Sequence, residues 1–304
     1  MSEIKNILFR ADSSSTLGTG HIMRDLVLAS QYQNATITFA VQNLVGNINY
    51  KILEAGYKIK ILKSNDIKEL HKLIVKLNID MIVIDHYGIN YSYEKNLKLK
   101  NSSLKIFSLD DTYKKHYCDI LLNHNISGDK KRYIDLVPKY CEVRAGSKYT
   151  LLRDEFIKEK KKLYKQNKKK TIFLSIGGSD HSNINIKILE VLQKFKNLKV
   201  NLLTTYANAN LQRLKNYTKN KKNIKLHVNS SSVARLMRKS DFGIITPSVT
   251  ANEAYFLQLP FILVKTADNQ EDLYTFLKLK HYATIKKINY KKLTRLLKKT
   301  LKQL

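Results

Sequence analysis

Residues 4–21, IKNILFRADSSSTLGTGH, predict the fold of the chain. Residues 4–10 have the apolar pattern of a strand, residues 11–20 form a polar loop with two glycines, and a helical pattern begins at His21. A strand, a small-residue loop and a helix in this order open the α/β units that bind nucleotides. The stretch 171–180, TIFLSIGGSD, repeats the order in the second half of the chain. The sequence therefore predicts two α/β halves that begin in the same way.

After each opening, short apolar runs alternate with helical patterns, as in proteins built on a buried parallel sheet. The lysine-rich segment 153–170 is helical in propensity and is the best candidate for a domain boundary. We therefore expect an α/β chain of two Rossmann-like domains, residues 1–152 and 153–304. The other predicted strands are 36–41, 59–62, 81–85, 105–109, 120–122, 200–203, 224–227, 242–246 and 261–264. The other predicted helices are 47–55, 67–77, 183–194, 233–238, 251–257 and an amphipathic closing helix over 290–304.

The composition excludes several classes of protein. Of the 304 residues, 43% are hydrophobic and 26% charged, which is ordinary for globular proteins and unlike disordered, collagen-like or coiled-coil chains. No apolar stretch approaches the roughly 20 residues that span a bilayer, so we expect no membrane partner. The only cysteines, Cys118 and Cys141, make neither a disulfide scaffold nor a cysteine-rich zinc site. We interpret them as core or surface residues of a reduced, cytoplasmic protein.

The formal net charge of +30 allows another interpretation, a basic protein that binds nucleic acid. However, 46 of the 55 basic residues are lysines and only nine are arginines. They are dispersed, with dense runs only at 158–170 and 286–302, whereas nucleic-acid binders cluster their cations and favour arginine at bases. The codons of an AT-rich genome would produce this composition. We therefore favour an anionic small molecule over nucleic acid, which stays as the alternative partner.

Glycine placement points to a phosphate-bearing ligand. Four of the ten glycines lie in the two opening loops, as Gly18 with Gly20 and Gly177 with Gly178. Glycine at these points lets backbone N–H groups approach an anion beside a helix N-terminus. Neither loop matches the three-glycine dinucleotide fingerprint or the Walker loop. The two equivalent loops favour a phosphorylated ligand held between two domains.

His21, directly after Gly20, is a candidate general base. Nearby helix N–H groups disfavour the imidazolium, so we expect a neutral ring that accepts a proton near pH 7. The alternative is an exposed or capping histidine. Arg10 and Asp12 lie at the end of the preceding strand, where active sites of α/β proteins gather, and are candidate substrate-binding residues.

A second polar segment follows the predicted strand 242–246. There, Ser248 and the amides after it are suited to cap a helix and to bind phosphate. Glu253 can accept hydrogen bonds from two sugar hydroxyls, and the alternative is a charge that favours the helix dipole. Asn269 and Gln270 follow the next strand and offer amides for neutral sugar groups.

Two acidic segments are weaker candidates. Asp85 and His86 resemble a metal-binding pair, but no third ligand accompanies them at a known spacing, and we predict no metal site. Asp110 and Asp111 allow a metal or sugar-nucleotide interpretation, although a solvated strand end or helix cap is favoured.

Read in order, several segments resemble the UDP-2,4-diacetamido-2,4,6-trideoxy-beta-L-altropyranose hydrolases of pseudaminic acid biosynthesis. The similarity spans nearly the whole chain. Its most specific parts are Gly-x-Gly-His-x-x-Arg and Asp-His-Tyr-Gly. The segments are 10–15 (RADSSS), 18–25 (GTGHIMRD), 85–89 (DHYGI), 118–123 (CDILLN), 141–144 (CEVR), 177–180 (GGSD), 252–254 (NEA) and 269–271 (NQE).

The resemblance implies a two-domain glycosyltransferase-B fold with the ligand in the interdomain cleft. It implies that water replaces the acceptor sugar, with inversion at the anomeric carbon, no metal or other cofactor and no obligate protein partner. Flagellin glycosylation is the implied downstream use. A UDP-sugar glycosyltransferase and a catalytically silent sugar-nucleotide binder of the same fold are alternatives. The implied site has His21 as base, Tyr87 and Asn269 beside the reacting sugar, and Gly177, Gly178, Ser248 and Glu253 on UDP, with Glu253 at the ribose. From their positions in the sequence we add Arg10, Asp12, Gly18, Gly20 and Gln270 as candidate substrate-binding residues and Ser179 and Val249 as candidate UDP-binding residues.

Overall fold

The computed structural model describes residues 4–164, 169–180 and 182–303. The chain divides into two compact units, residues 1–151 and 152–304. Of the predicted helical segment 153–170, the structure has helix α5 over Asp154–Lys160, and residues 165–168 lie outside the described residues. Within the described ranges, no helix is long and apolar enough to cross a membrane.

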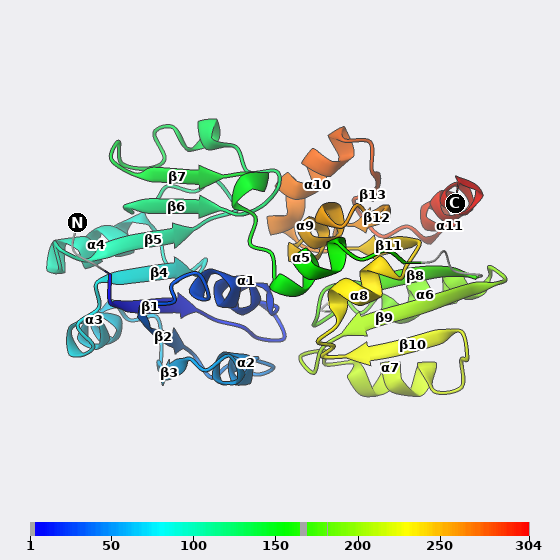
Figure 1. Ribbon diagram of the computed structural model, residues 1–304, viewed down its shortest axis with the longest axis horizontal. Helices are drawn as coiled ribbons and strands as arrows, with labels where there is room; N and C mark the ends of the chain where they lie inside the picture. Colours follow the sequence, from blue (N-terminus) through cyan, green and yellow to red (C-terminus); the bar gives the residue numbers. More distant parts are fainter. Residues whose placement is uncertain (1–3, 165–168, 181, 304) are drawn as a thin grey trace. The chain divides into compact units, whose positions relative to one another are not determined.

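The N-terminal unit is built on a seven-stranded sheet in the order β3-β2-β1-β4-β5-β6-β7 (Figure 1). All neighbouring strands are parallel. Ala11 pairs with Asp85, so β1 and β4 end side by side. The strands are β1 Asn6–Ala11, β2 Thr36–Val41, β3 Lys58–Ile61, β4 Met81–Asp85, β5 Lys105–Leu109, β6 Ile120–Asn123 and β7 Glu142–Ala145.

Alternating side chains of this sheet build one core on each face, as the two-residue period of a strand requires. Ile7 and Phe9 of β1 pack in a cluster with side chains of helices α1 and α2. Leu8 of β1 packs in a second cluster with side chains of α3 and α4. The helices are α1 Gly20–Ala29, α2 Asn49–Glu54, α3 Ile67–Lys76 and α4 Tyr91–Lys100, with short 3-10 turns η1 Lys130–Tyr133 and η2 Ser147–Tyr149.

The C-terminal unit repeats this architecture with a six-stranded parallel sheet in the order β10-β9-β8-β11-β12-β13. Its strands are β8 Lys170–Ser175, β9 Leu198–Thr204, β10 Ile224–Val228, β11 Phe242–Ile245, β12 Phe261–Val264 and β13 Ala283–Ile285. Its other helices are α6 Asn185–Gln193, α7 Leu211–Thr218, α8 Val233–Arg238, α9 Val249–Phe256, α10 Glu271–Leu279 and α11 Tyr290–Gln303, with a 3-10 turn η3 at Asp268–Gln270.

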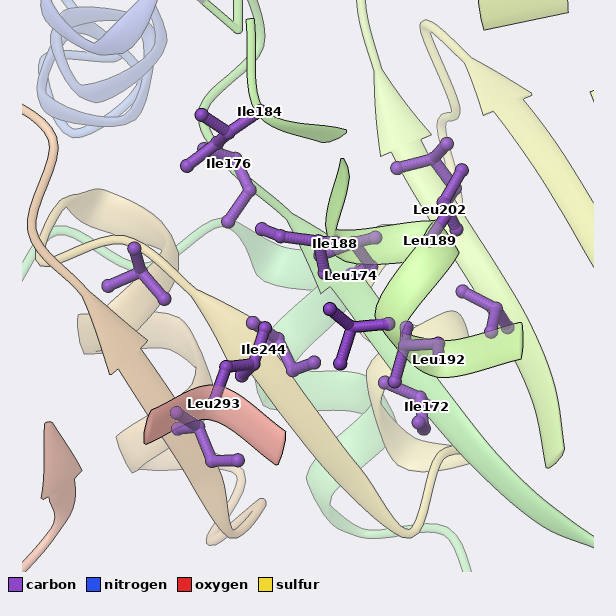
Figure 2. Packing of buried hydrophobic residues seen from close by; sticks show 14 of the residues in the cluster. Ile172, Leu174, Ile176, Ile184, Ile188, Leu189, Leu192, Leu202, Ile244 and Leu293 are labelled. Atoms are coloured by element: carbon purple, nitrogen blue, oxygen red, sulfur yellow. The ribbon is translucent and has the colours of Figure 1, made fainter. Parts of the chain in front are cut away.

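The core of the C-terminal unit joins the sheet to its covering helices. Leu174 of β8 packs in one cluster with Ile188 and Leu192 of α6 (Figure 2). The closing helix α11 contributes Leu293 and Leu297, both fully buried, as its amphipathic pattern predicted. Burying one such leucine is worth about 1.5–3 kcal/mol, so these contacts attach the end of the chain firmly to its unit.

Both sheets have the strand order of a nucleotide-binding Rossmann unit, in which the chain reverses direction along the sheet after its third strand. The reversal places β1 beside β4 in one unit and β8 beside β11 in the other. Ligands of such sheets bind outside the carboxyl ends of the strands at this point. We therefore expect ligand-binding residues in the loops after β1, β4, β8 and β11.

Elements that the sequence analysis did not predict bury polar side chains or lie at an edge. Helix α4 buries Glu94 and Leu97, and a helix whose inward face carries a carboxylate shows no apolar stripe. Strand β7 is an edge strand with exposed Glu142 and half-buried neighbours, so its pattern is not that of a buried strand. The short edge strand β13 and helices α7 and α10 were also not singled out.

Candidate active site

The loop between β1 and α1 is closed by its own backbone. Ser14 and Gly18 exchange two hydrogen bonds, from Gly18 N to Ser14 O at 2.9 Å and from Ser14 N to Gly18 O at 3.2 Å. Gly18 has a φ of +82°, a left-handed conformation that glycine adopts without strain. Helix α1 starts two residues later at Gly20, which places His21 in its first turn.

Asp85 holds the ring of His21. Nδ1 of His21 lies 2.9 Å from the backbone oxygen of Asp85 and 3.2 Å from its Oδ1. Both of these oxygens are acceptors, so Nδ1 carries the proton and the lone pair of the neutral ring is on Nε2. A ring fixed in this tautomer can accept a proton at Nε2 without turning.

The electrostatics of His21 differ from the prediction. We expected the helix N-terminus to keep the ring neutral by disfavouring the imidazolium. Burial does disfavour the charged ring, but the Asp85 carboxylate outweighs it and raises the pKa of His21 above its usual value. The reason is that a full negative charge in contact with the ring affects its pKa more than the partial positive charge of a helix N-terminus does.

Arg24 keeps Asp85 ionised. Its Nε donates to Asp85 Oδ2 at 2.6 Å and its Nη2 to Asp85 Oδ1 at 2.5 Å, the paired geometry that a carboxylate binds best. Burial favours the neutral acid, but Arg24 and His21 together hold the pKa of Asp85 well below its usual range. Asp85 is thus a fixed negative charge behind His21.

Tyr87 and Asp111 complete the same cluster. Tyr87 donates its hydroxyl hydrogen bond to Asp111 Oδ1 at 2.9 Å, and Asp111 Oδ2 accepts one from Arg24 Nη1 at 3.0 Å. The Tyr87 ring stands edge-on to the His21 ring, with centroids 4.9 Å apart. Since 38% of Tyr87 is exposed, it can contact both a ligand and His21.

The favoured interpretation of Asp110 and Asp111 as a solvated strand end or helix cap is wrong. Asp110 is buried and accepts hydrogen bonds from Thr112 N at 3.0 Å and from the Tyr133 hydroxyl at 2.9 Å. Asp111 belongs to the His21 cluster through Arg24. The two neighbours serve different buried networks, which no local pattern reveals.

Arg10, on β1, is not part of the His21 cluster. It is fully buried, and its Nη1 and Nη2 donate to the two oxygens of Asp12 at 2.8 and 2.7 Å. Asp12 is buried as well and also accepts from Gln42 N at 2.6 Å. We had expected both residues to bind substrate. The structure instead makes Arg10 the partner that fixes Asp12, and we assign neither a direct contact with a ligand.

Asp85 and His86 do not converge on one point. His86 Nε2 lies 3.2 Å from Asp12 Oδ2, whereas Asp85 binds Arg24 and His21. In the part of the chain that the structure describes, no three His, Cys, Asp or Glu side chains are grouped to hold a metal ion.

In the C-terminal unit, the glycine loop after β8 is pinned from β9. The carbonyl oxygen of Gly178 accepts hydrogen bonds from Thr205 N at 3.0 Å, Thr205 Oγ1 at 3.0 Å and Thr204 Oγ1 at 3.1 Å. Gly177 has a φ of +72°, again a glycine conformation. Ser179, next in the chain, is buried.

Ser248 occupies the N-cap position of α9, directly before Val249. The predicted side-chain cap is wrong, because Ser248 Oγ makes no capping hydrogen bond among the described residues and lies 3.2 Å from Thr246 Oγ1. Its backbone oxygen accepts from Ala251 N at 2.8 Å. The helix start therefore presents its first amides without a side chain folded over them.

Glu253 is held by an arginine that the sequence analysis did not single out. Nε and Nη2 of Arg153 donate to Glu253 Oε1 at 3.0 and 2.9 Å, and Arg153 Nη1 lies 2.6 Å from Glu155 Oε1. Burial raises the pKa of Glu253 although Arg153 opposes this. Both hydrogen bonds from Arg153 go to Oε1, so Oε2 can accept a hydrogen bond from another donor.

Gln270 closes its own loop. Its Oε1 accepts from Thr266 N at 2.8 Å and Ala267 N at 3.2 Å. The side-chain oxygen of Gln270 therefore has a structural role, and the substrate contact of Gln270, which stays a prediction, would come from its NH2 group. Asn269, in the same 3-10 turn, is exposed.

The chain is 41% identical, over 91% of its own length and 97% of the other's, to a UDP-2,4-diacetamido-2,4,6-trideoxy-beta-L-altropyranose hydrolase of Campylobacter jejuni. The chain belongs to this hydrolase family. It is therefore an enzyme by family, and the resemblance drawn from its motifs is confirmed. No protein-family model matches the chain.

Solved structures show the fold of this hydrolase family member. MurG of Acinetobacter baumannii is similar with a TM-score of 0.63 at 11% identity, over 98% of this chain and 91% of that one. A structure of Staphylococcus aureus MnaA with UDP is similar with a TM-score of 0.64 at 12% identity, over 98% and 88%. The predicted glycosyltransferase-B fold of two Rossmann-like domains is confirmed.

Two more buried residues of the hydrolase chain surround Arg24. Asp25 is fully buried, and neither carboxyl oxygen has a hydrogen-bond partner within the described residues. Burial and the negative charge of the nearby Asp85 raise the pKa of Asp25 well above its usual range. His124 Nε2 lies 3.3 Å from Arg24 Nη1, and burial with Arg24 lowers the pKa of His124 to about 3.

A signal for part of this cluster was present in the sequence. Arg24 and Asp25 follow His21 by three and four residues, the spacing that puts side chains on one helix face. Both lie in the segment that carries the family resemblance. Asp85 is 64 residues from His21, and only the pairing of β1 with β4 brings them together.

Proposed function

We propose that this protein hydrolyses UDP-2,4-diacetamido-2,4,6-trideoxy-beta-L-altropyranose to UDP and 2,4-diacetamido-2,4,6-trideoxy-L-altrose, a step of pseudaminic acid biosynthesis. The proposal takes its substrate from the hydrolase relative of Campylobacter jejuni. It takes its chemistry from one observation, the His21 ring held at Nδ1 by Asp85. In this proposal the N-terminal unit carries the catalytic base, and the C-terminal unit binds UDP.

His21 is the general base of the proposed reaction. Its Nε2 takes a proton from water as the water oxygen attacks the anomeric carbon, opposite the UDP oxygen, so the configuration inverts. The Asp85 carboxylate stabilises the imidazolium that forms, and Arg24 keeps Asp85 in place. A positioned base of this kind contributes typically 100- to 10,000-fold.

Tyr87 positions the sugar in this proposal. It is exposed, it contacts His21 edge-on, and its hydroxyl is oriented by Asp111. The amides of Gly18 and Gly20 lie at the start of the same helix and suit a polar group of the substrate. The exposed Asn269 is the proposed amide contact from the C-terminal unit.

UDP is held by backbone amides and one carboxylate in the proposed complex. The amides at Gly177, Gly178 and Ser179 and at the α9 start, Ser248 and Val249, bind the diphosphate. UDP is a good leaving group, so the main demand is to stabilise the charge that grows on it. Preorganised donors contribute about 2.7–4 kcal/mol each in measured cases.

Glu253 binds the ribose in the same complex. Arg153 binds its Oε1 twice and fixes the carboxylate plane. The other oxygen, Oε2, then accepts hydrogen bonds from ribose hydroxyls. No step of the proposed reaction uses a metal ion.

The deciding experiment is incubation of the full chain with the altrose-type UDP-sugar in oxygen-18 water, with products read by NMR and mass spectrometry. We expect free sugar and UDP in equal amounts, with the label in the sugar. Label in UDP instead would mean attack at phosphorus and would refute the proposed mechanism. UDP-N-acetylglucosamine is the matched control and is expected to react far more slowly.

A UDP-sugar glycosyltransferase is the second candidate, favoured by the fold that the chain shares with glycosyltransferases. The same experiment separates the two. A glycosyltransferase would release little UDP until an acceptor sugar is added, whereas the proposed hydrolase turns over fully with water alone.

A further inference from the structure

The two cysteines meet at one end of the N-terminal sheet. Cys118 lies two residues before β6, and Cys141 lies one residue before β7. Glu142 N donates to Asp119 O at 2.9 Å, so the residues that follow the two cysteines join the strands. Both thiols are free, and their sulfur atoms are 3.7 Å apart.

This geometry allows a bond between the sulfurs. A disulfide needs a sulfur separation of about 2.05 Å and Cα atoms roughly 4.4–6.8 Å apart, and neighbouring strands are about 4.8 Å apart. Both side chains already point the same way, because they pack in the same cluster on one face of the sheet. Small side-chain rotations therefore suffice to close the gap.

The two thiols differ in access and in acidity. Cys118 is buried, whereas Cys141 is half-buried and open to a small molecule. The hydrogen bond from the Cys118 thiol lowers the pKa of Cys141, and the same contact with burial raises the pKa of Cys118. The thiolate is the nucleophilic form of cysteine. Cys141 is thus the attacking cysteine, and Cys118 is the resolving cysteine.

We propose that Cys118 and Cys141 are an oxidation site for peroxides, at which the pair closes to a disulfide. The Cys141 thiolate attacks a peroxide oxygen, breaks the O–O bond and becomes a sulfenic acid while the peroxide leaves as water. The Cys118 sulfur then attacks Cys141 sulfur and a second water leaves. Two thiols and hydrogen peroxide give one disulfide and two waters, so the sulfurs lose two electrons and the peroxide gains them.

The oxidation site is separate from the candidate active site. The cysteines precede β6 and β7, at the amino ends of the strands, whereas His124 follows β6 at its carboxyl end. In a parallel sheet all amino-terminal strand ends lie at one end of the sheet and all carboxyl-terminal strand ends at the other. The disulfide would tie the edge strand β7 to β6.

The test is peroxide treatment of the native full chain, followed by alkylation of remaining thiols and trypsin digestion without reductant. Trypsin cuts after Lys115, Lys130, Lys139 and Arg144, so the cysteines fall in separate peptides, 116–130 and 140–144. We expect these peptides to appear joined and to separate after dithiothreitol. Two still-alkylated cysteines, or a disulfide between two copies on a non-reducing gel, would overturn the proposal.

Single variants test the order of events and do not depend on the disulfide. In Cys118→Ser, peroxide should convert Cys141 to a sulfenic acid that dimedone traps. In Cys141→Ser, Cys118 should lose its thiol at least about tenfold more slowly than Cys141 does in Cys118→Ser. Cys118 is buried, and its raised pKa disfavours the thiolate. If Cys118 in Cys141→Ser were oxidised as fast as Cys141 in Cys118→Ser, Cys141 would not be the attacking sulfur.

Discussion

His21 and Asp85 contact each other twice, through the backbone oxygen of Asp85 at 2.9 Å and through its Oδ1 at 3.2 Å, and both contacts reach the same ring nitrogen. The carbonyl contact fixes the ring, and the carboxylate contact sets its charge preference. A hydrogen bond to the backbone would survive substitution of Asp85, whereas the charge would not. The orientation and the basicity of His21 can therefore be separated by experiment.

His21→Ala removes the proposed base. We expect kcat for the UDP-sugar to fall 100- to 10,000-fold, with binding of substrate changed little, because the base acts on water and not on the nucleotide. Steady-state kinetics and calorimetry measure the two quantities. His71→Ala, on the partly exposed face of α3, is the matched control and should keep its activity. Near-normal turnover of His21→Ala would remove the general-base role.

Asp85→Asn keeps the backbone contact and removes the charge. The wild-type rate should fall as the pH drops through the pKa of His21, because the protonated ring cannot accept a proton. Asp85 raises that pKa, so in Asp85→Asn the acid limb of the pH–rate profile should move to lower pH. The plateau rate should fall as well, since the imidazolium loses its counter-ion. An unmoved acid limb would show that Asp85 does not set the basicity of His21.

The sequence was sufficient for the elements whose burial is apolar. Strands β2, β4 and β5 were predicted with the bounds that they have, because strands covered on both faces are rich in buried apolar side chains. Helix α4 was missed because it buries Glu94, which accepts hydrogen bonds from Ser108 Oγ and Tyr117 N. A polar core contact carries no periodic signal.

The candidate site was predicted only where its residues share one loop or one helix. His21 stood out because it follows Gly20 at a helix start, and Tyr87 came from the family motif. Asp85 was considered for a metal, and its real partner Arg24 is 61 residues away. Arg10 was assigned to substrate although it is buried against Asp12, and nothing in the sequence indicated that Gln270 Oε1 accepts hydrogen bonds from its own loop. Which polar groups face one another depends on strand order, and the sequence does not state it.

His116 links stability to pH. Its Nδ1 lies 2.8 Å from Glu94 Oε1 and its Nε2 lies 3.8 Å from Asp110 Oδ1. Burial opposes the charge, but these carboxylates raise the pKa of His116 from 6.5 to about 9. A raised pKa adds stability that is fully present below pH 6.5 and is lost as the pH rises through about 9. The loss is about 3 kcal/mol at 1.36 kcal/mol per unit.

Urea unfolding between pH 6 and pH 10 measures this loss. His116→Gln should be less stable than the wild type at pH 6, and the difference in stability between the two proteins should shrink as the pH rises through about 9. His71→Gln, which lies outside the network, should follow the wild type. Parallel curves for His116→Gln and the wild type would contradict the buried imidazolium.

Asp25 should also lower the stability of the fold as the pH rises, through a carboxyl group and not through an imidazole. Its folded pKa lies well above the value of 3.8 in the unfolded chain, so folding takes up a proton and stability falls as the pH rises above about 4. Asp25→Asn removes that requirement. The stability of the variant relative to wild type should therefore increase with pH, by up to about 1.4 kcal/mol per unit. Because the readout is a slope, a constant packing cost of the amide does not affect it.

Glu253→Gln tests the proposed ribose contact. The amide keeps the shape of the side chain, but it loses the charge that Arg153 binds and that ribose hydroxyls would donate to. Charge-assisted hydrogen bonds are worth about 1.5–3 kcal/mol, so we expect the Kd for UDP to rise roughly 10- to 100-fold. Calorimetry with UDP alone measures this without catalysis. Glu271→Gln is the control and should bind UDP as the wild type does, because Glu271 is only partly buried and pairs with Lys265 and Lys286. Unchanged affinity in Glu253→Gln would leave Glu253 as a structural partner of Arg153 and place the ribose elsewhere.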